Sequence, residues 1–161
     1  MIRTKIKIGD NGEIQDTFDV YGLCYLSADK IFAAPAKEME KTTYPEQEGE
    51  NLLPTVADDA FDYKVTFLIE AREGLDKVGE VVSLFNNAIR TNASDDGTKI
   101  YHQITFYNPA RNVTIVGYPK PISTASEYWV DARGNRSDAA KVEFTIRVNK
   151  PSLCNFQQCE L

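Results

Sequence analysis

Alternation of apolar and polar residues is the strongest pattern in the sequence, and it predicts β-strands. From Phe61 to Ala71 every second residue is apolar or aromatic, and Val142 to Val148 repeats the pattern before Pro151. Ile2 to Ile8 alternates as well, with its isoleucines on one side and its charged residues on the other. Because successive side chains of a strand point to opposite faces, each run predicts a strand with one buried face.

Other apolar runs predict a further strand and two hairpins. Phe18 to Leu26 is apolar on both sides and predicts a more buried strand, interrupted at Gly22. Ile100 to Phe106 and Val113 to Tyr118 predict a hairpin, and Glu127 to Lys141 predicts another around Gly134-Asn135. In the first hairpin, Ile100, His102, Ile104 and Phe106 are expected to share the inward face.

One segment has helical spacing. Leu75, Val78, Val82, Phe85 and Ile89 recur three and four residues apart, which predicts a helix from about Leu75 to Arg90 with one apolar stripe. Because the strands are joined by hairpins rather than by helical crossovers, the sheet is expected to be antiparallel. The fold class is therefore α+β: a mostly antiparallel β-sandwich or half-barrel, with one flanking helix at about 75–90.

A long connection, at about residues 30–59, interrupts these patterns. It contains Pro35, Pro45 and Pro54, and a polar, acidic stretch from Glu46 to Asn51. Either it is a solvated loop, or it is an arm that becomes ordered on a neighbouring subunit; its apolar residues favour the arm. The candidate partner-contact residues are Tyr44, Glu46, Glu48, Glu50, Leu52, Leu53, Asp58 and Asp59.

The whole chain, 1–161, is expected to form one domain with a short C-terminal tail at 151–161. Its net charge of −6 argues against nucleic-acid binding, which requires a basic face. No apolar run approaches 18 residues and the N-terminus does not resemble a secretory signal, so we expect no membrane span and a chain that stays in the cytoplasm of the cell that makes it.

Residues for catalysis or cofactor binding are scarce. His102 is the one histidine, and its apolar neighbours favour a core histidine over a catalytic base. Cys24 is expected to be a buried apolar residue, whereas Cys154 and Cys159 form a single pair without the further ligands of a zinc site. The loop carboxylates fit solvation or partner contact better than glycoside hydrolysis. We therefore expect no enzyme activity, cofactor or metal.

The aromatic residues keep a second possibility open. Tyr101, Tyr107, Tyr118, Tyr128 and Trp129 could line a platform for a sugar. A small-ligand or glycan-binding β-sandwich is therefore the alternative to a protein that works by assembly. Tyr128 and Trp129 are neighbours in a strand and point to opposite faces, so at least one is expected in the core.

Short phrases between Tyr44 and Cys154 resemble tail proteins of long-tailed bacteriophages, especially those of prophages in Bacteroides-type gut bacteria. The N-terminal domain of distal tail proteins, which joins the tail tube to the baseplate, is similar too. The segments that carry the resemblance are Tyr44–Asn51, Asp58–Phe67, Phe85-Asn86, Ile104–Asn108, Val116–Pro119 and Lys150–Asn155.

The resemblance implies a virion structural protein with the β-sandwich or half-barrel fold of tail tube proteins. It implies a ring homo-oligomer, commonly of six subunits, stacked on other tail proteins in the virion. Distal tail proteins often carry a further C-terminal domain, and this chain stops soon after Pro151, so the resemblance admits a short form of a distal tail protein, or a tail tube or tail-completion protein instead.

Overall fold

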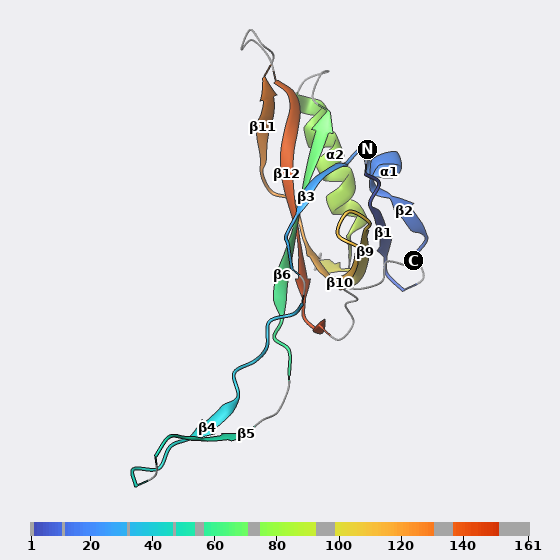
Figure 1. Ribbon diagram of the computed structural model, residues 1–161. Coiled ribbons are helices and arrows are strands. Elements are labelled where there is room, and N and C mark those ends of the chain that lie inside the picture. Colours follow the sequence, from blue (N-terminus) through green and yellow to red (C-terminus); the bar gives the residue numbers. More distant parts are fainter. Residues whose placement is uncertain are drawn as a thin grey trace.

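A computed structural model describes residues 2–10, 12–31, 33–46, 48–53, 57–70, 75–92, 99–130 and 137–151 (Figure 1). Two helices and twelve strands make up this part of the chain. In order they are β1 (Lys5–Ile8), β2 (Ile14–Asp16), α1 (Thr17–Tyr21), β3 (Cys24–Ala28), β4 (Glu40–Thr42), β5 (Asn51–Leu53), β6 (Phe61–Glu70), α2 (Leu75–Ala88), β7 (Arg90–Asn92), β8 (Lys99–Tyr101), β9 (Ile104–Asn108), β10 (Val113–Lys120), β11 (Ala125–Val130) and β12 (Ser137–Val148).

The main sheet has eight strands in the order β2-β1-β9-β10-β12-β6-β3, with β11 also paired to β12. Every pairing among the described strands is antiparallel. The first part of β10, Val113–Gly117, pairs with β9, whereas its last part, Tyr118–Lys120, pairs with β12. The predicted fold class is confirmed: a mostly antiparallel sheet with one substantial helix.

Gly117 lies at the position where β10 changes its partner strand. A Cβ atom at this position would lie 2.4 Å from the backbone oxygen of Arg147 on β12. Only glycine allows the two backbones to approach so closely. Gly117 therefore lets one strand belong to both halves of the sheet, and the sheet can bend around the core.

The core lies between the two halves of the sheet and α2. The alternating residues of β6 are buried as predicted, from Phe61 to Ile69, and those of β12 are buried from Val142 to Val148. The Phe85 ring of α2 meets the Phe144 ring edge to face, with centroids 4.9 Å apart. Asn86 also fixes the helix, because its side chain exchanges two hydrogen bonds with the backbone of Ile122.

The prediction of one strand from Phe18 to Leu26 is wrong in its first half, where the structure has α1. Asp16 caps this helix by accepting hydrogen bonds from the amides of Phe18 and Asp19, at 2.9 and 3.2 Å. Gly22 ends it in the left-handed conformation, with φ of 78°. An N-cap aspartate and a glycine six residues later are helix-boundary signals. The apolar residues between these two signals favoured a strand in the sequence pattern.

The predicted strand from Ile100 to Phe106 is also corrected. It is divided into β8 and β9, because the His102 amide donates a hydrogen bond to the Ile89 carbonyl at 3.0 Å, beyond the end of α2. Ile104 and Phe106 are buried, but Ile100 is half-exposed and His102 is partly exposed, so neither joins the core face. Ile2, expected beside Ile6, is likewise half-exposed.

Candidate assembly surfaces

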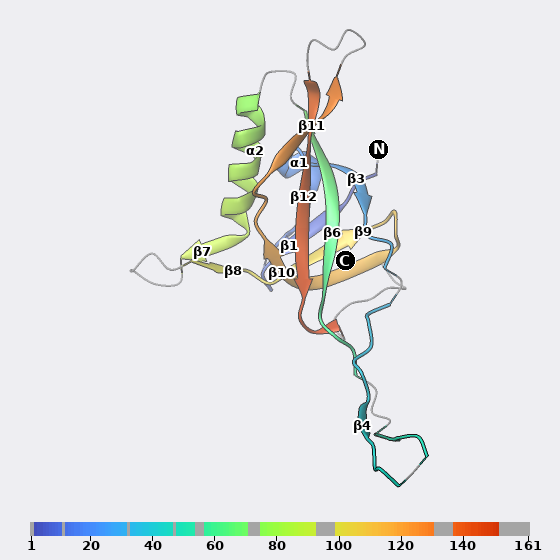
Figure 2. The same ribbon diagram turned by 90° about the vertical axis from the view of Figure 1, so that its left-hand side faces the viewer.

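The long connection contains paired strands rather than an irregular loop, and we call its residues 35–59 the arm, for its shape. It continues β3 and β6 as a two-stranded ribbon: the Lys37 amide donates to the Ala57 carbonyl, and the Asp59 amide to that of Pro35. Further out, β4 and β5 pair with Glu40 opposite Leu53 and Thr42 opposite Asn51. Figures 1 and 2 both show this hairpin standing well away from the sheet.

The structure divides the predicted contact residues between two places on the arm. Tyr44, Glu46, Glu48 and Glu50 lie in or next to the connection between β4 and β5, and Leu52 lies on β5; all five are exposed. Leu53 lies on β5 opposite Glu40, but the structure does not describe its side chain. Asp58 and Asp59 are exposed at the base of the ribbon, where Asp58 pairs with Ala36.

Three apolar side chains on or beside the hairpin are exposed to solvent. Tyr44 and Leu52 are each 52% exposed, and Met39, which the sequence reasoning did not single out, is 47% exposed. A β-hairpin without a sheet or helix against it is marginally stable at best. Exposed apolar side chains on such an element favour a role in binding rather than in folding of the chain that carries them.

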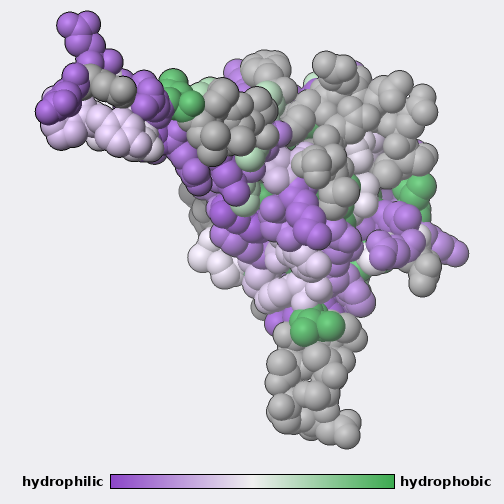
Figure 3. All heavy atoms as spheres, turned by 90° about the horizontal axis from the view of Figure 1, so that it is seen from below, coloured by the Kyte–Doolittle hydropathy of each residue, from purple (hydrophilic) through white to green (hydrophobic). Residues whose placement is uncertain are grey.

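Negative charge is concentrated on the arm. Residues 35–59 hold seven carboxylates and two lysines, so most of the net charge of −6 lies there. Lys41 lies 3.9 Å from a Glu50 carboxylate oxygen, an exposed pair worth little stability. Seen from below, the described surface is mostly hydrophilic, with small separate hydrophobic patches (Figure 3). A partner of the arm should therefore be cationic with apolar groups.

A cluster of hydrogen-bonded polar side chains joins the body to the two strands that continue into the arm. The side-chain amide of Asn108 donates hydrogen bonds to the hydroxyls of Tyr63 at 3.2 Å and Tyr25 at 3.4 Å. These tyrosines belong to β6 and β3, the two strands that the arm extends. Burial raises the pKa of Tyr63 to about 12, although the Asn108 hydrogen bond acts in the opposite direction.

Two strand edges of the body form another candidate surface. Among the described strands, β2 pairs only with β1, β3 only with β6, and β11 only with β12; β3 and β11 belong to one row of strands. Strands with unpaired backbone groups at an edge are templates for pairing with another chain. The sequence does not indicate which edges stay open, because strand order depends on contacts far apart in the chain.

Sites for small molecules are poorly developed in the described part of the chain. A hollow of about 320 Å³ lies between α1 and α2, and another of about 220 Å³ beside β2; both are open to solvent. No group of three metal-ligating side chains occurs among the described residues. None of the helices described is long and apolar enough to cross a membrane.

The candidate aromatic platform is not assembled from the tyrosines that can be placed. Tyr107 lies opposite Lys5, and Tyr118 lies opposite Arg147 on another strand pair. Tyr101 packs against the core. The structure does not describe the side chains of Tyr128 and Trp129.

Cys24 is half-buried, and burial raises the pKa of its thiol, which disfavours the reactive thiolate. Cys154 and Cys159 lie outside the described residues.

Comparison with known proteins gives a match at the level of fold. Neither a scan of protein-family models nor a search of curated proteins finds a match. Among solved structures, the chain is similar to the crystal structure of Dit (gp 19.1) of phage SPP1, described as a paradigm of the hub adsorption apparatus of phages that infect Gram-positive bacteria. The TM-score is 0.55 and the identity 16%; the match covers 92% of this chain and 50% of Dit, so this chain spans half the length of that protein.

Proposed function

We propose that this protein is a non-enzymatic structural subunit of a phage or prophage tail, and that it forms a ring where the tail tube meets the baseplate. The observation that carries the proposal is the similarity in fold to SPP1 Dit over 92% of the chain. The phrases that resemble tail proteins support it independently, since they come from the sequence. The Bacteroides-type host is part of the proposal and rests on that resemblance alone.

Open strand edges suggest how a ring would form. In the row β11-β12-β6-β3, the two open edges lie on opposite sides of the same four strands. Pairing of β3 in one subunit with β11 in the next would satisfy backbone groups on both strands. Such a contact joins two different surfaces, so repetition closes a ring if the rotation allows it. The resemblance to distal tail proteins suggests six subunits.

The arm would add a second contact between subunits or between rings. Its acidic, apolar hairpin extends beyond the body, so it can reach a neighbour without rearrangement of the core. Other tail proteins would be the remaining partners, and the virion tail the location. Neither nucleic acid nor a membrane is among the proposed partners.

Solution mass tests the proposal directly. We expect light scattering of the purified chain to show a ring-sized oligomer, or growth towards one as concentration rises, and electron microscopy of the largest species to show closed rings. Antibodies against the chain should also label the tail end of intact virions. Virions that contain no copy of the chain would overturn the tail role whatever its solution mass.

A further inference from the structure

One outward face of the sheet has the chemistry that the arm requires. In β1 the inward residue Ile6 is fully buried, so Lys5 and Lys7 on either side of it point outward. Lys5 lies opposite Tyr107 on β9, and Lys7 lies opposite Thr105. On the other side of β1, Lys7 lies opposite Ile14, which is 47% exposed. We call Lys5, Lys7, Ile14, Thr105 and Tyr107 the lysine face.

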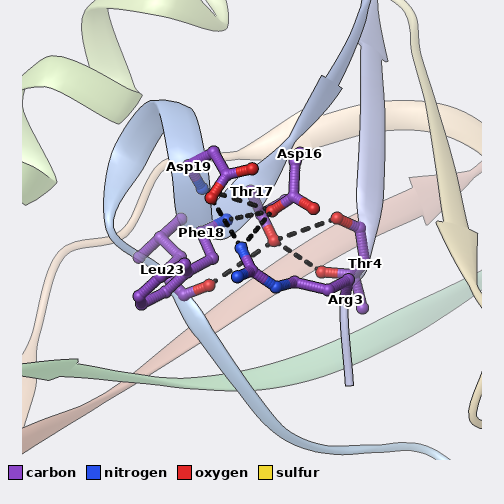
Figure 4. Close-up of polar contacts among 7 residues, drawn as sticks. All are labelled: Arg3, Thr4, Asp16, Thr17, Phe18, Asp19 and Leu23. Atoms are coloured by element: carbon purple, nitrogen blue, oxygen red, sulfur yellow. Dashed lines mark hydrogen bonds and ion pairs between the residues drawn. The ribbon is translucent and has the colours of Figure 1, made fainter. Parts of the chain in front are cut away.

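Two carboxylates beside this face, those of Asp16 and Asp19, are already engaged. Arg3 lies 2.6 Å from an Asp19 carboxylate oxygen and 3.5 Å from one of Asp16, and it stacks over the Phe18 ring at 4.5 Å (Figure 4). Asp16 lies directly opposite Lys5, but its carboxylate accepts the two amides that begin α1. Arg3 therefore forms ion pairs with both acids, one positive charge facing two negative ones.

Neither Lys5 nor Lys7 forms an ion pair within the part of the chain that the structure describes. Among the described residues, no carboxylate oxygen lies within 4.0 Å of the amine of Lys5 or Lys7. Asp10 and Glu13 lie in the turn between β1 and β2, beyond the paired rows. On the outer face of β12 and β10, by contrast, Lys120 and Arg147 share one carboxylate, since Asp62 lies 3.3 Å from both.

We propose that the lysine face receives the arm of a second copy of this chain. The inference rests on the proposed function and names the surface to which the arm binds. Glu48 and Glu50 would lie near Lys5 and Lys7, and Tyr44 and Leu52 would cover the exposed side of Ile14. Opposite charges around apolar contacts give register and selectivity to an interface.

One observation favours a second copy as the occupant, and another favours this face over a different site. Figures 1 and 2 show the hairpin far from β1 of its own chain, so the arm that reaches the lysine face belongs to another copy. The hollow between α1 and α2, with the exposed Val20 and Leu84, is the other apolar candidate, but it is lined by Lys77 together with Asp19 and Glu80. One lysine beside two carboxylates attracts an acidic arm less than Lys5 and Lys7 do.

The test is reversal of charge on each side and then on both, in the full-length chain. Lys5→Glu with Lys7→Glu, and separately Glu48→Lys with Glu50→Lys, should each raise the dissociation constant for self-association at least about tenfold, because like charges then face each other. All four changes in one chain should restore it to within about threefold. The measurement is sedimentation at several concentrations, with circular dichroism to verify folding.

Controls separate the proposal from general charge effects and from misfolding. Lys77→Glu with Lys150→Glu makes the same change in net charge at exposed positions elsewhere, and should leave self-association nearly unchanged. If Lys5→Glu with Lys7→Glu fails to fold, Lys5→Gln with Lys7→Gln should still weaken association. Equal weakening by the control pair, or no recovery in the fourfold variant, would overturn the inference while leaving the ring intact.

A chain that stays monomeric at every concentration would also overturn the inference, since a second copy is its stated occupant. The tail role would then depend on the virion labelling described above, so the two failures can be distinguished. A wild-type ring that is insensitive to reversal on either side would show that the arm binds elsewhere.

Discussion

The body and the arm are built from the same antiparallel pairing, but they differ in what lies behind it. In the body, β6 and β12 pair over ten residues from Ala139–Glu70 to Val148–Phe61, and their inner face is covered by α2 and the other half of the sheet. In the arm, β4 and β5 pair over three residues, and the apolar side chains that can be placed are exposed. Both regions therefore have antiparallel backbone pairing, but only the body buries its apolar side chains.

This difference assigns the two regions different roles. Burial of apolar surface provides most of the stability of a fold, and a lone hairpin has little of it. The body therefore buries the apolar surface that a fold requires, whereas under the proposed function the arm would bury its apolar side chains against another molecule. Changes in the body should lower the free energy of unfolding, and changes in the arm should affect assembly.

The largest expected effect is that of Phe67→Ala in the core. Phe67 is fully buried, and its ring meets that of Phe106 edge to face at 6.2 Å. Removal of a buried phenylalanine leaves a cavity, so the free energy of unfolding should fall by about 3–5 kcal/mol in denaturant titration. Thr66→Ala, on the outer face of the same strand, is the control. A loss well under about 1 kcal/mol for Phe67→Ala would contradict the assigned facing of β6.

Gly117→Ala should come next, because it tests the bend that closes the body. The new Cβ would lie 2.4 Å from the Arg147 carbonyl oxygen, a backbone atom that cannot move without shifting β12. We expect a loss of about 1–3 kcal/mol in thermal or denaturant unfolding. Gly79→Ala is the matched control: it lies in α2 with open space around it, and should stabilise by about 0.5–1 kcal/mol. Equal effects at the two glycines would argue against the close approach.

A smaller effect is expected at Tyr63, next to the base of the arm. Tyr63→Phe removes one acceptor of the Asn108 amide and should cost about 1 kcal/mol near neutral pH. The pKa of Tyr63 is raised to about 12 in the folded chain, while an unfolded tyrosine titrates near 10. The folded state thus keeps a proton that the unfolded state loses, and stability should fall as pH rises from about 10 to about 12. Unfolding titrations should show a weaker fall for Tyr63→Phe than for wild type.

Particular residues show how much of this molecule the sequence could reveal. The alternation in Phe61–Glu70 and Val142–Val148 predicts which residues are buried, because strand geometry is local. The same rule fails at Ile100, whose exposure depends on a pairing between β7 and β8 that the run of residues does not encode. Tyr44 and Leu52 could be predicted as candidate contact residues because apolar groups are unexpected in a solvated loop. The lysine face could not be predicted from the sequence, because Ile14, Lys7 and Thr105 are brought together only by strand pairing in the folded sheet.

The smallest effect on stability, and the most informative for function, is expected from deletion of Glu46–Asn51. These residues connect β4 to β5 or begin β5, and those the structure describes lie outside the core. The free energy of unfolding should therefore change by no more than about 0.5 kcal/mol, as for surface changes in general. Self-association in light scattering should nevertheless be clearly weakened. Glu46→Gln, Glu48→Gln and Glu50→Gln in one chain keep the length of the hairpin, and should weaken association less than the deletion if apolar contacts contribute. An unchanged oligomer after the deletion would show that the arm is dispensable, and ring formation would then rest on the strand edges alone.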